Sequence, residues 1–360
     1  MIRTVIKGTG CYIPDRVIKN GDFLNHEFYE KTGIKLNKPN QGIIDKLQEI
    51  TEIKERRYAQ EDLMNSDIAA IASKRAIDQA MIDPEQIDYI IAAHNYGDVN
   101  IHSHQSNLMP SISAKVKNKL GIKNIYCKPY DMIFGCPGWI EGIILSDQLF
   151  KLEKAKNILV VGAETLSRVL DPYDRNCMIF SDGAGAALLS AVNTDKPIGV
   201  IEYNTRCDNN KEIYYLSNKP SLNPDYKESL LNIGMEGKKI YEYALTYVPN
   251  FIKDILDKAN LSIRDIKKIF IHQANAKMDY AILKRLLKLY DITYDSKVHE
   301  SLMPMTIQKL GNSSVATVPT LLAKVFHNEI PGHALTKGDK IIMVSLGAGM
   351  HINGLIYELD

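Results

Sequence analysis

A cysteine in the first half of the chain stands in a setting that suits a nucleophile. Cys136 lies within Phe134–Trp139 (FGCPGW), after an apolar run and before a pattern of helical periodicity. Proline is favoured in the first turn of a helix, so Pro137 predicts a helix that starts immediately after the cysteine. Helix N-termini favour thiolates, and the flanking glycines permit a tight turn. The pattern predicts a nucleophilic cysteine, and a buried structural cysteine at a helix start is the alternative.

Two side chains further along the chain are candidates for the partners that a nucleophilic cysteine needs: a base or cationic group, and a group that orients the reaction. His272 directly follows Lys268–Ile271 (KIFI), an apolar run typical of a buried strand. Sites of α/β proteins collect at such carboxyl ends of strands. Asn312 lies in Gly311–Ser314 (GNSS), at the start of another helical pattern. A hydrogen-bonded structural histidine and a helix N-cap are the plainer alternatives.

A glycine-rich turn, Leu346–Met350 (LGAGM), follows the apolar run Lys340–Ser345. Such a turn can present a backbone N–H group to a developing oxyanion. It lacks the length and the lysine of a phosphate-binding loop. His102 and His104 lie in a polar segment without further ligands, which favours a loop over a metal site there.

One predicted helix, over 276–289, is basic. It carries Lys277, Lys284, Arg285 and Lys288, and Lys284 and Lys288 share one face at i, i+4 spacing. Such a face is usually only solvated, and docking of an acidic partner is the functional alternative.

Short apolar runs alternate with helical patterns along the chain and supply the elements that position these residues. We expect buried strands in the runs at Asp88–Ala93, Asn157–Gly162, Lys268–Ile271 and Lys340–Ser345. Helices are expected over 66–81, 109–120, 137–152, 238–260, 276–289 and 313–326. This alternation predicts an α/β protein whose sheets are covered by helices.

The chain also repeats itself weakly. Ile77–Ala93 aligns with Leu256–His272 at a constant offset of 179, and four of the seventeen positions are identical. The offset is close to half the chain, so we expect two related halves, 1–193 and 194–360, with the boundary near 193–196. In each half a Gly-X step leads into a helix, at Gly135 and at Gly311. Pseudo-twofold packing would bring these two helix starts together.

Composition excludes several classes of function. The 360 residues carry a net charge of +1 and are 45% hydrophobic and 24% charged. The chain is too apolar to be disordered and too neutral for nucleic acid to be its default partner. No apolar run approaches the roughly 18 residues of a membrane span, and the N-terminal apolar stretch is too short for a signal peptide. Five cysteines without a CxxC pair argue against a disulfide framework, so a reduced cytoplasmic compartment is expected.

Taken together, these motifs resemble the thiolase-fold condensing enzymes, specifically 3-oxoacyl-(acyl-carrier-protein) synthase III. The resemblance extends over nearly the whole chain, and its specific part is the order of the cysteine turn, HQAN at His272–Asn275, and GNSS at Gly311–Ser314. It also includes GTGCYIP at Gly8–Pro14 and DPYDRNCMIFSDGAGAALL at Asp171–Leu189. The fold that it implies is two similar halves in α-β-α-β-α layers.

The resemblance implies a ketosynthase with Cys136, His272 and Asn312 as catalytic residues. Cys136 would take an acyl group from a thioester, and His272 and Asn312 would stabilise the enolate formed when a malonyl group on acyl carrier protein loses CO₂. The carbanion would then attack the acyl-Cys to give a 3-oxoacyl product. The backbone N–H groups of Cys136 and Gly349 would form the oxyanion hole. Neutral donors of this kind need no metal and no cofactor.

The same resemblance implies the partners. Asn275 matches a family position that contacts pantetheine, and Lys277 takes a place usually held by arginine. The carrier protein would dock on the basic helix through Lys284, Arg285 and Lys288. Homodimers are the usual state of the family.

The sequence departs from the family pattern at several positions. Housekeeping members grip the adenine of acyl-CoA with a tryptophan and an arginine, where this chain has Lys46 and Ile50. Delivery of the primer by a carrier protein is therefore expected, as is a specialised pathway such as pigment biosynthesis. Glu141 falls on the helix behind the cysteine and needs a buried partner or water. The unusually polar segment Asn95–Asn107 is expected to reshape the acyl pocket.

Three alternatives use the same residues. A chalcone-type synthase would extend repeatedly and cyclise, and an acyltransferase would make an ester or amide without decarboxylation. Hydroxymethylglutaryl-CoA synthase would need an acidic general base that the sequence does not assign. The non-enzyme alternative is a silent partner that only binds acyl carrier protein, and the intact set of Cys136, His272 and Asn312 argues against it.

Overall fold

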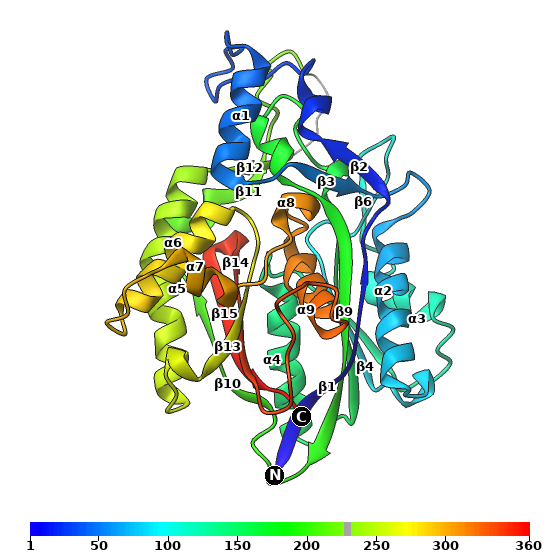
Figure 1. Ribbon diagram of the computed structural model, residues 1–360. Helices are drawn as coiled ribbons and strands as arrows, with labels where there is room; N and C mark the ends of the chain where they lie inside the picture. The colour runs from blue at the N-terminus through cyan, green and yellow to red at the C-terminus, as the bar shows by residue number, and fades with distance from the viewer. Residues whose placement is uncertain (227–231) are drawn as a thin grey trace.

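The computed structural model describes residues 1–226 and 232–360. Two β-sheets lie side by side, with helices between them and on both outer faces (Figure 1). The molecule is therefore built in the five layers α-β-α-β-α that the family resemblance implies. Among the described helices, none is both long and apolar enough to span a lipid bilayer.

The first sheet has five strands in the order β1-β9-β8-β4-β7. The two pairs formed by β9 are antiparallel, and β4 pairs in parallel with both β8 and β7. Its strands are β1 (Ile2–Tyr12), β4 (Tyr89–Ala93), β7 (Lys128–Met132), β8 (Asn157–Thr165) and β9 (Asp182–Asn193).

The second sheet repeats this arrangement without a fifth strand. Its order is β10-β15-β14-β13, with two antiparallel pairs followed by a parallel pair. Its strands are β10 (Gly199–Cys207), β13 (Ile266–Ile271), β14 (Lys340–Gly347) and β15 (His351–Glu358). The strands of each sheet thus come from one half of the sequence. The division of the chain into two domains at residue 193 stays a prediction.

The weak sequence repeat has a structural counterpart. The 3₁₀ turn η2 (Pro84–Gln86) precedes β4, and η6 (Ile263–Asp265) precedes β13 at the same spacing of 179 residues. A long helix comes before each turn: α2 (Asn65–Ala80) covers the first sheet, and α5 (Gly237–Lys258) covers the second.

Two helices form the central layer between the sheets. These are α4 (Gly138–Lys151) and α9 (Thr317–Phe326), and both start at the same end of the molecule (Figure 1). The outer layers are α2 with α3 (Ile112–Lys119) on one side, and α5 with α6 (Ala276–Lys288) on the other.

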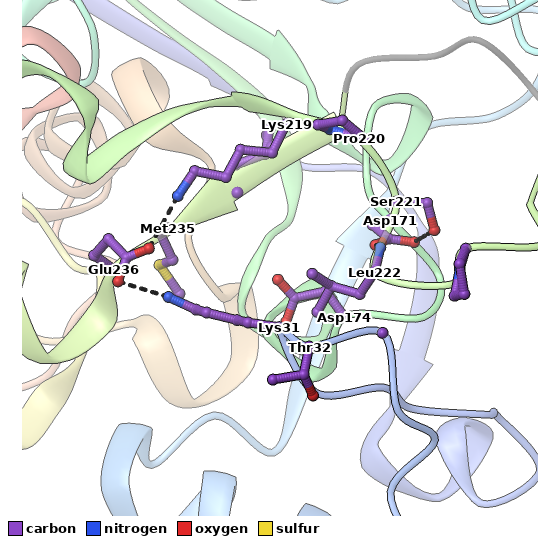
Figure 2. Close-up of a pocket in the computed structure, with 14 residues that line it drawn as sticks. Lys31, Thr32, Asp171, Asp174, Lys219, Pro220, Ser221, Leu222, Met235 and Glu236 are labelled. Carbon is purple, nitrogen blue, oxygen red and sulfur yellow. Dashed lines mark hydrogen bonds and ion pairs between the residues drawn. The ribbon is translucent and has the colours of Figure 1, made fainter.

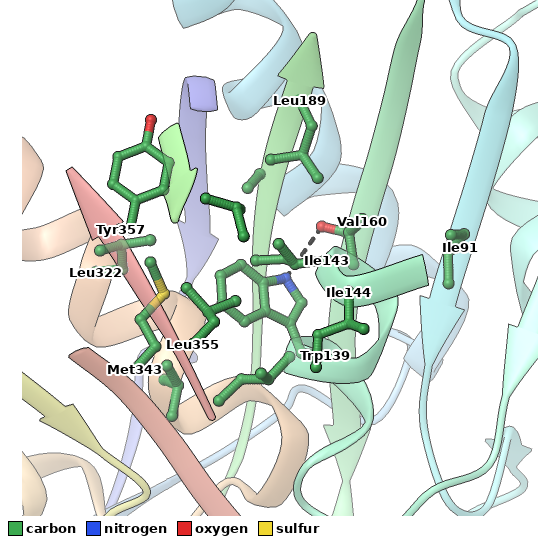
Figure 3. Close-up of a cluster of buried hydrophobic side chains, with 14 of the residues drawn as sticks. Ile91, Trp139, Ile143, Ile144, Val160, Leu189, Leu322, Met343, Leu355 and Tyr357 are labelled. Carbon is green, nitrogen blue, oxygen red and sulfur yellow. Dashed lines mark hydrogen bonds between the residues drawn. The ribbon is translucent and has the colours of Figure 1, made fainter. Parts of the chain in front are cut away.

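Trp139 anchors the central layer. Its side chain is 1% exposed and lies among aliphatic residues of α4, α9 and both sheets (Figure 3). The indole N–H group donates to the carbonyl oxygen of Val160 on β8 at 3.2 Å, so the one polar atom of the ring is satisfied. Truncating such a side chain costs on the order of 3–5 kcal/mol, and this packing therefore fixes the position of the first turn of α4.

The structure corrects three details of the predicted elements. The helix expected over 109–120 begins only at Ile112, because Ser111 caps it by accepting from the N–H group of Ala114. The helix expected over 313–326 is divided into η8 (Ser314–Ala316) and α9. The helix α1 (Asn40–Thr51) was not predicted.

The remaining short elements surround the end of the molecule where α1 lies, or connect the main ones. They are β2 (Arg16–Lys19), η1 (Asn20–Phe23), β3 (Glu55–Tyr58), β5 (Asp98–Val99), β6 (Ser106–Asn107), η3 (Leu166–Arg168), η4 (Arg175–Ile179), η5 (Lys211–Tyr215), β11 (Leu216–Lys219), β12 (Asn232–Met235), α7 (Ser296–His299), η7 (Glu300–Leu302), α8 (Ile307–Leu310) and η9 (Ala348–Met350).

Glu141 joins α4 to the second sheet. One of its carboxylate oxygens accepts hydrogen bonds from the Thr205 hydroxyl on β10, at 2.8 Å, and from the Asn353 side-chain amide on β15. The partner that the sequence required for this carboxylate is therefore present on the opposite layer.

We predict that Glu141→Ala lowers the free energy of unfolding by about 1–3 kcal/mol, because it leaves the buried amide of Asn353 without this acceptor. Urea denaturation followed by circular dichroism measures the change. Asp254→Ala, at an exposed position of α5, is the control and should cost less than about 0.5 kcal/mol. Equal losses for the two variants would contradict the structural link.

Candidate active site

One large cavity, of about 1020 Å³, collects the predicted site residues. Cys136, His272, Asn312 and Asn275 all line it. Most of the rest of its wall is apolar and comes from α1, the starts of α5 and α6, the strands β11, β12 and β14, and the short helices η4 and η9. These side chains include Ile43, Leu47, Ile179, Phe180, Leu216, Met235, Ile240, Met278, Leu346 and Met350.

Cys136 lies at the start of α4, as predicted, although Pro137 is the N-cap and the helix begins at Gly138, one residue later than expected. The cysteine is partly exposed to the cavity. Burial raises the pKa of its thiol to about 11, and the negative charge of Glu164 acts in the same direction. The Ser314 hydroxyl opposes them by donating to the sulfur at 3.2 Å. Desolvation thus opposes the thiolate that the helix start favours. The hydrogen bond from Ser314 is therefore important for stabilising the charged sulfur.

His272 directly follows β13, and its backbone N–H group donates to the carbonyl oxygen of Val344 on β14. Nδ1 lies 2.6 Å from the Thr317 hydroxyl oxygen. Burial lowers the pKa of the imidazole to about 4, so the ring is neutral at physiological pH. A ring nitrogen can therefore donate or accept without introducing a buried charge.

The Thr317 hydroxyl has one proton and two neighbours. In the structure it donates to the carbonyl oxygen of Ser314 at 3.0 Å, which makes Nδ1 of His272 the donor to Thr317. If the proton turns to Nδ1 instead, the imidazole proton moves to Nε2. The orientation of this hydroxyl thus selects the tautomer of His272.

Asn312 is held by the backbone. Its side-chain oxygen accepts from the N–H group of Ser314 at 2.8 Å, and its own backbone forms a bridge with Phe180. Because the amide oxygen is engaged, the NH₂ group is the part of this side chain that can donate to a ligand in the cavity.

Ser314 bonds Cys136, Asn312 and Thr317, and through Thr317 it is linked to His272. Sequence reasoning missed it, although GNSS contains it. Its N–H group bonds Asn312, its hydroxyl bonds Cys136, and its carbonyl accepts from Thr317. Its φ angle is +52°, a left-handed conformation that is uncommon for serine. The unfavourable backbone conformation is what directs its three polar groups toward three different partners.

The glycine-rich turn packs directly on the cysteine turn. A Cβ atom on Gly347 would lie 2.5 Å from the backbone nitrogen of Cys136, and one on Gly135 would lie 2.7 Å from the nitrogen of Ala348. Only glycine permits these approaches. Gly349, the predicted oxyanion donor, is one residue further along, and the side chain of Asn209 donates to its carbonyl at 2.8 Å.

The mouth of the cavity carries the positions where the chain departs from the family pattern. Lys46 and Ile50 of α1 both line it. Asn275 caps α6 by accepting from the N–H group of Met278 at 3.0 Å. Lys277 lies 3.3 Å from Glu49 of α1, so an ion pair joins the two helices beside the mouth.

The predicted docking residues lie on the outer surface of α6. Lys284, Arg285 and Lys288 are exposed. Arg285 also donates to the carbonyl oxygen of Leu245 on α5, which holds its guanidinium close to the protein.

A second cavity, of about 390 Å³, contains a different kind of chemistry (Figure 2). Glu236 lies between Lys31 and Lys219, with N–O distances of 2.7 and 3.1 Å. The hydrogen bond from Lys31 is the main cause that lowers the pKa of Glu236 to about 2. Asp171 accepts from Ser221 and from the backbone of Leu222. These groups satisfy one another, which indicates a structural role.

Metal ligation finds no support in the described part of the chain. Within residues 1–226 and 232–360, no group of three or more histidine, cysteine, aspartate or glutamate side chains is placed to hold a metal ion.

Sequence reasoning also missed an acid whose charge acts on Cys136. This residue is Glu164, which is 1% exposed. It lies on β8 in the segment GAET and carried no recognisable signal.

The sequence matches two family models. Residues 130–209 match 3-oxoacyl-[acyl-carrier-protein (ACP)] synthase III, and residues 256–359 match the C-terminal part of the same family. Among curated proteins, the β-ketoacyl-[acyl-carrier-protein] synthase III of Fusobacterium nucleatum is 32% identical, with 98% of each chain covered. The protein of that name from Clostridium perfringens is 33% identical over the same share of both chains.

Solved structures agree. The 3-oxoacyl-[acyl-carrier-protein] synthase III of Aquifex aeolicus superposes with a TM-score of 0.77 and 26% identity, over 99% of both chains. The corresponding synthase III of Thermus thermophilus gives a TM-score of 0.79 and 25% identity over the same share. The chain therefore belongs to the 3-oxoacyl-[acyl-carrier-protein] synthase III family of condensing acyltransferases, which have the thiolase fold.

Proposed function

We propose that this protein is a ketosynthase that joins an acyl thioester to a malonyl group on acyl carrier protein, with loss of CO₂. The observation that carries the proposal is the meeting of Cys136, His272 and Asn312 in one apolar cavity, tied together through Ser314. A thiol, a neutral imidazole and an amide are sufficient for acyl transfer and enolate stabilisation.

In the first half-reaction the sulfur of Cys136 attacks the thioester carbonyl. The tetrahedral intermediate collapses, the thiol of the primer leaves with a proton, and the acyl group stays on Cys136. The predicted oxyanion donors are the N–H groups of Cys136 and Gly349, and the packing of the turn makes the N–H group of Ala348 a further candidate.

In the second half-reaction the malonyl thioester loses CO₂ to give an enolate. The NH₂ group of Asn312 donates to its oxygen. Nε2–H of His272 donates to the same oxygen once the Thr317 hydroxyl turns from the Ser314 carbonyl to Nδ1. The enolate carbon attacks the acyl-Cys136 carbonyl, the cysteine sulfur leaves, and a 3-oxoacyl thioester forms. Asn275 at the mouth would contact the pantetheine arm.

Lys46 and Ile50 support primer delivery by a carrier protein. They line the mouth where housekeeping members are expected to grip adenine, and neither provides the same stacking surface as tryptophan. With a cavity of about 1020 Å³ behind them, they favour a primer other than a small acyl-CoA, and a specialised biosynthetic pathway.

Incubation with a mixed panel of acyl-CoA and acyl carrier protein primers, followed by intact-mass and peptide mass spectrometry, tests the proposal. We expect one acyl group on Cys136 and a larger acylated fraction with carrier protein primers than with CoA primers. Cys136→Ala should not be acylated. Product mass after addition of malonyl carrier protein separates a single condensation from repeated extension or ester formation. No adduct from any primer would overturn the proposal.

We expect His272→Ala to keep acylation of Cys136 and to lose at least about 100-fold in CO₂ release from malonyl carrier protein, because one enolate donor is missing. Since the pKa of His272 is lowered to about 4, the imidazole stays neutral as the pH falls from 8 to 5.5. CO₂ release by the pre-acylated enzyme should therefore show no titration near pH 6.5. Such a titration, absent in His272→Ala, would contradict this account.

Charge reversal at Lys284 and Arg285 tests carrier docking on α6. The double change to glutamate should raise KM for malonyl carrier protein by several-fold, and more at low salt, with kcat little changed. Lys154→Glu, beyond the opposite end of α4 from Cys136, is the matched control. An unchanged KM would exclude this face as the docking site.

We propose a homodimer formed through β7, an edge strand of the first sheet. Large apolar side chains on and beside it are exposed: Tyr130, Ile133, Ile125, Tyr126 and Met109. Ile133→Glu should shift the mass measured by light scattering from dimer to monomer. Ile34→Glu, at a similarly exposed isoleucine remote in sequence, should not. A monomeric unmodified protein would contradict the assignment.

A further inference from the structure

A buried carboxyl group that the proposed reaction does not use lies behind the nucleophile. Glu164, near the end of β8, is 1% exposed. Its Oε1 accepts two hydrogen bonds from Asn95, from the backbone N–H group at 2.7 Å and from the side-chain NH₂ group at 2.5 Å. Asn95 follows β4, so this pair joins two neighbouring strands of the first sheet below the cavity.

The carboxyl group fixes the orientation of the Asn95 amide. Because the backbone N–H group of Asn95 already donates to Oε1 of Glu164, this oxygen is an acceptor, and rotating the amide by 180° would place a second acceptor against it. The NH₂ group therefore faces Glu164, and its second hydrogen is directed at the Ser314 hydroxyl oxygen, 3.2 Å away. Both bonds from Asn95 end on the same oxygen, so the arrangement holds whether or not the other carboxyl oxygen is protonated.

The Ser314 hydroxyl is oriented in turn. Because its oxygen accepts from Asn95, its proton is free to point away from the amide, and the sulfur of Cys136 lies 3.2 Å away as the acceptor. A hydroxyl can donate only one hydrogen bond. The chain Glu164–Asn95–Ser314 thus delivers that one hydrogen bond to the sulfur.

We propose that Ser314 is a further catalytic residue, whose hydroxyl stabilises the Cys136 thiolate, and that Asn95 and Glu164 are the positioning residues that aim it. The proposal rests on the proposed function only for the identity of the nucleophile. Ser314 contacts the reacting sulfur, whereas Asn95 and Glu164 act through it.

The electrostatics of the site give this hydrogen bond a function. Among residues 1–226 and 232–360, the titratable side chains around Cys136 are Glu164 on β8, Tyr96 after β4, and His272 after β13. Burial raises the pKa of Tyr96 and lowers that of His272, so both stay neutral between pH 6 and 9. Burial also raises the pKa of Glu164 to about 8, with Asp182 adding to the effect. Ser314 thus opposes both desolvation and a negative charge that develops above neutral pH.

Alkylation of the unacylated, full-length protein by iodoacetamide tests the proposal across pH 6 to 10. Peptide mass spectrometry reads Cys136 and the exposed Cys207 in the same sample, so Cys207 is an internal reference. We expect Ser314→Ala to slow alkylation of Cys136 at pH 8 by roughly tenfold through loss of one hydrogen bond to a charged sulfur. Asn95→Leu should have the same effect, with the rate at Cys207 unchanged.

The double variant decides whether the two residues act as one unit. If Asn95 acts through Ser314, combining the two changes should leave the rate about tenfold below that of the unmodified protein. Independent effects would multiply to roughly a hundredfold and would overturn the proposal, as would an unchanged rate in Asn95→Leu. Asn65→Ala is the matched control: this buried amide bonds the carbonyl oxygen of Ala163, next to Glu164, and has no role in orienting Ser314.

Two changes at Glu164 keep the test decisive if Asn95→Leu does not fold. Glu164→Gln retains an oxygen that accepts from Asn95 and removes the charge, so alkylation at pH 9 should be as fast as in the unmodified protein or faster. Glu164→Leu removes the acceptor, and the rate should fall as in Ser314→Ala; an unchanged rate would refute the positioning role. Alkylation needs no acyl substrate, so this outcome is independent of whether the acylation assay supports the proposed function.

Discussion

The active-site geometry depends on the hydrogen bonds of one residue. Ser314 uses its N–H group for Asn312, its hydroxyl for Cys136, and its carbonyl for Thr317, which bonds His272. It does so in a left-handed conformation that costs a serine on the order of 1 kcal/mol or more. The strained backbone at Ser314 has no chemical role of its own. It turns three polar groups of one residue toward three side chains from different elements.

The two sheets supply the frame in which this residue sits. In both sheets two antiparallel strand pairs are followed by parallel pairing. The central helices α4 and α9 start at the same end of the molecule. The pairing of Gly135 with Ala348 and of Gly347 with Cys136 brings the two strand ends into backbone contact. Cys136 is therefore enclosed by both halves of the sequence. The burial that results raises the pKa of its thiol.

Local signals were sufficient to predict an α/β protein with helix-covered sheets, most of its long helices and three of the residues in the cavity, whereas the five layers came from the family resemblance. A few neighbouring residues were enough to identify each of the three cavity residues. The cysteine precedes a proline at a helix start, the histidine follows a buried strand, and the asparagine lies between glycine and serine. The strands β1, β9, β10 and β15 were not singled out; the pairing of β1 with β9 and of β10 with β15 joins residues far apart in sequence, which a short window does not show. Ser314, Asn95 and Glu164 carry no such signal, since their importance comes from contacts between segments far apart in sequence, Asn95 with Glu164 and Ser314 with Cys136 and Asn95.

The position of β15 in the second sheet has a consequence for synthesis of the protein. This strand is the last one in chain order, yet it lies in the interior of its sheet, between β10 and β14. The turn that packs on Cys136 leads directly into it. A nascent chain on the ribosome thus cannot form the surroundings of its thiol until residues 347–358 have emerged. The surroundings that raise the pKa of Cys136 are therefore assembled only after this last strand has been synthesised.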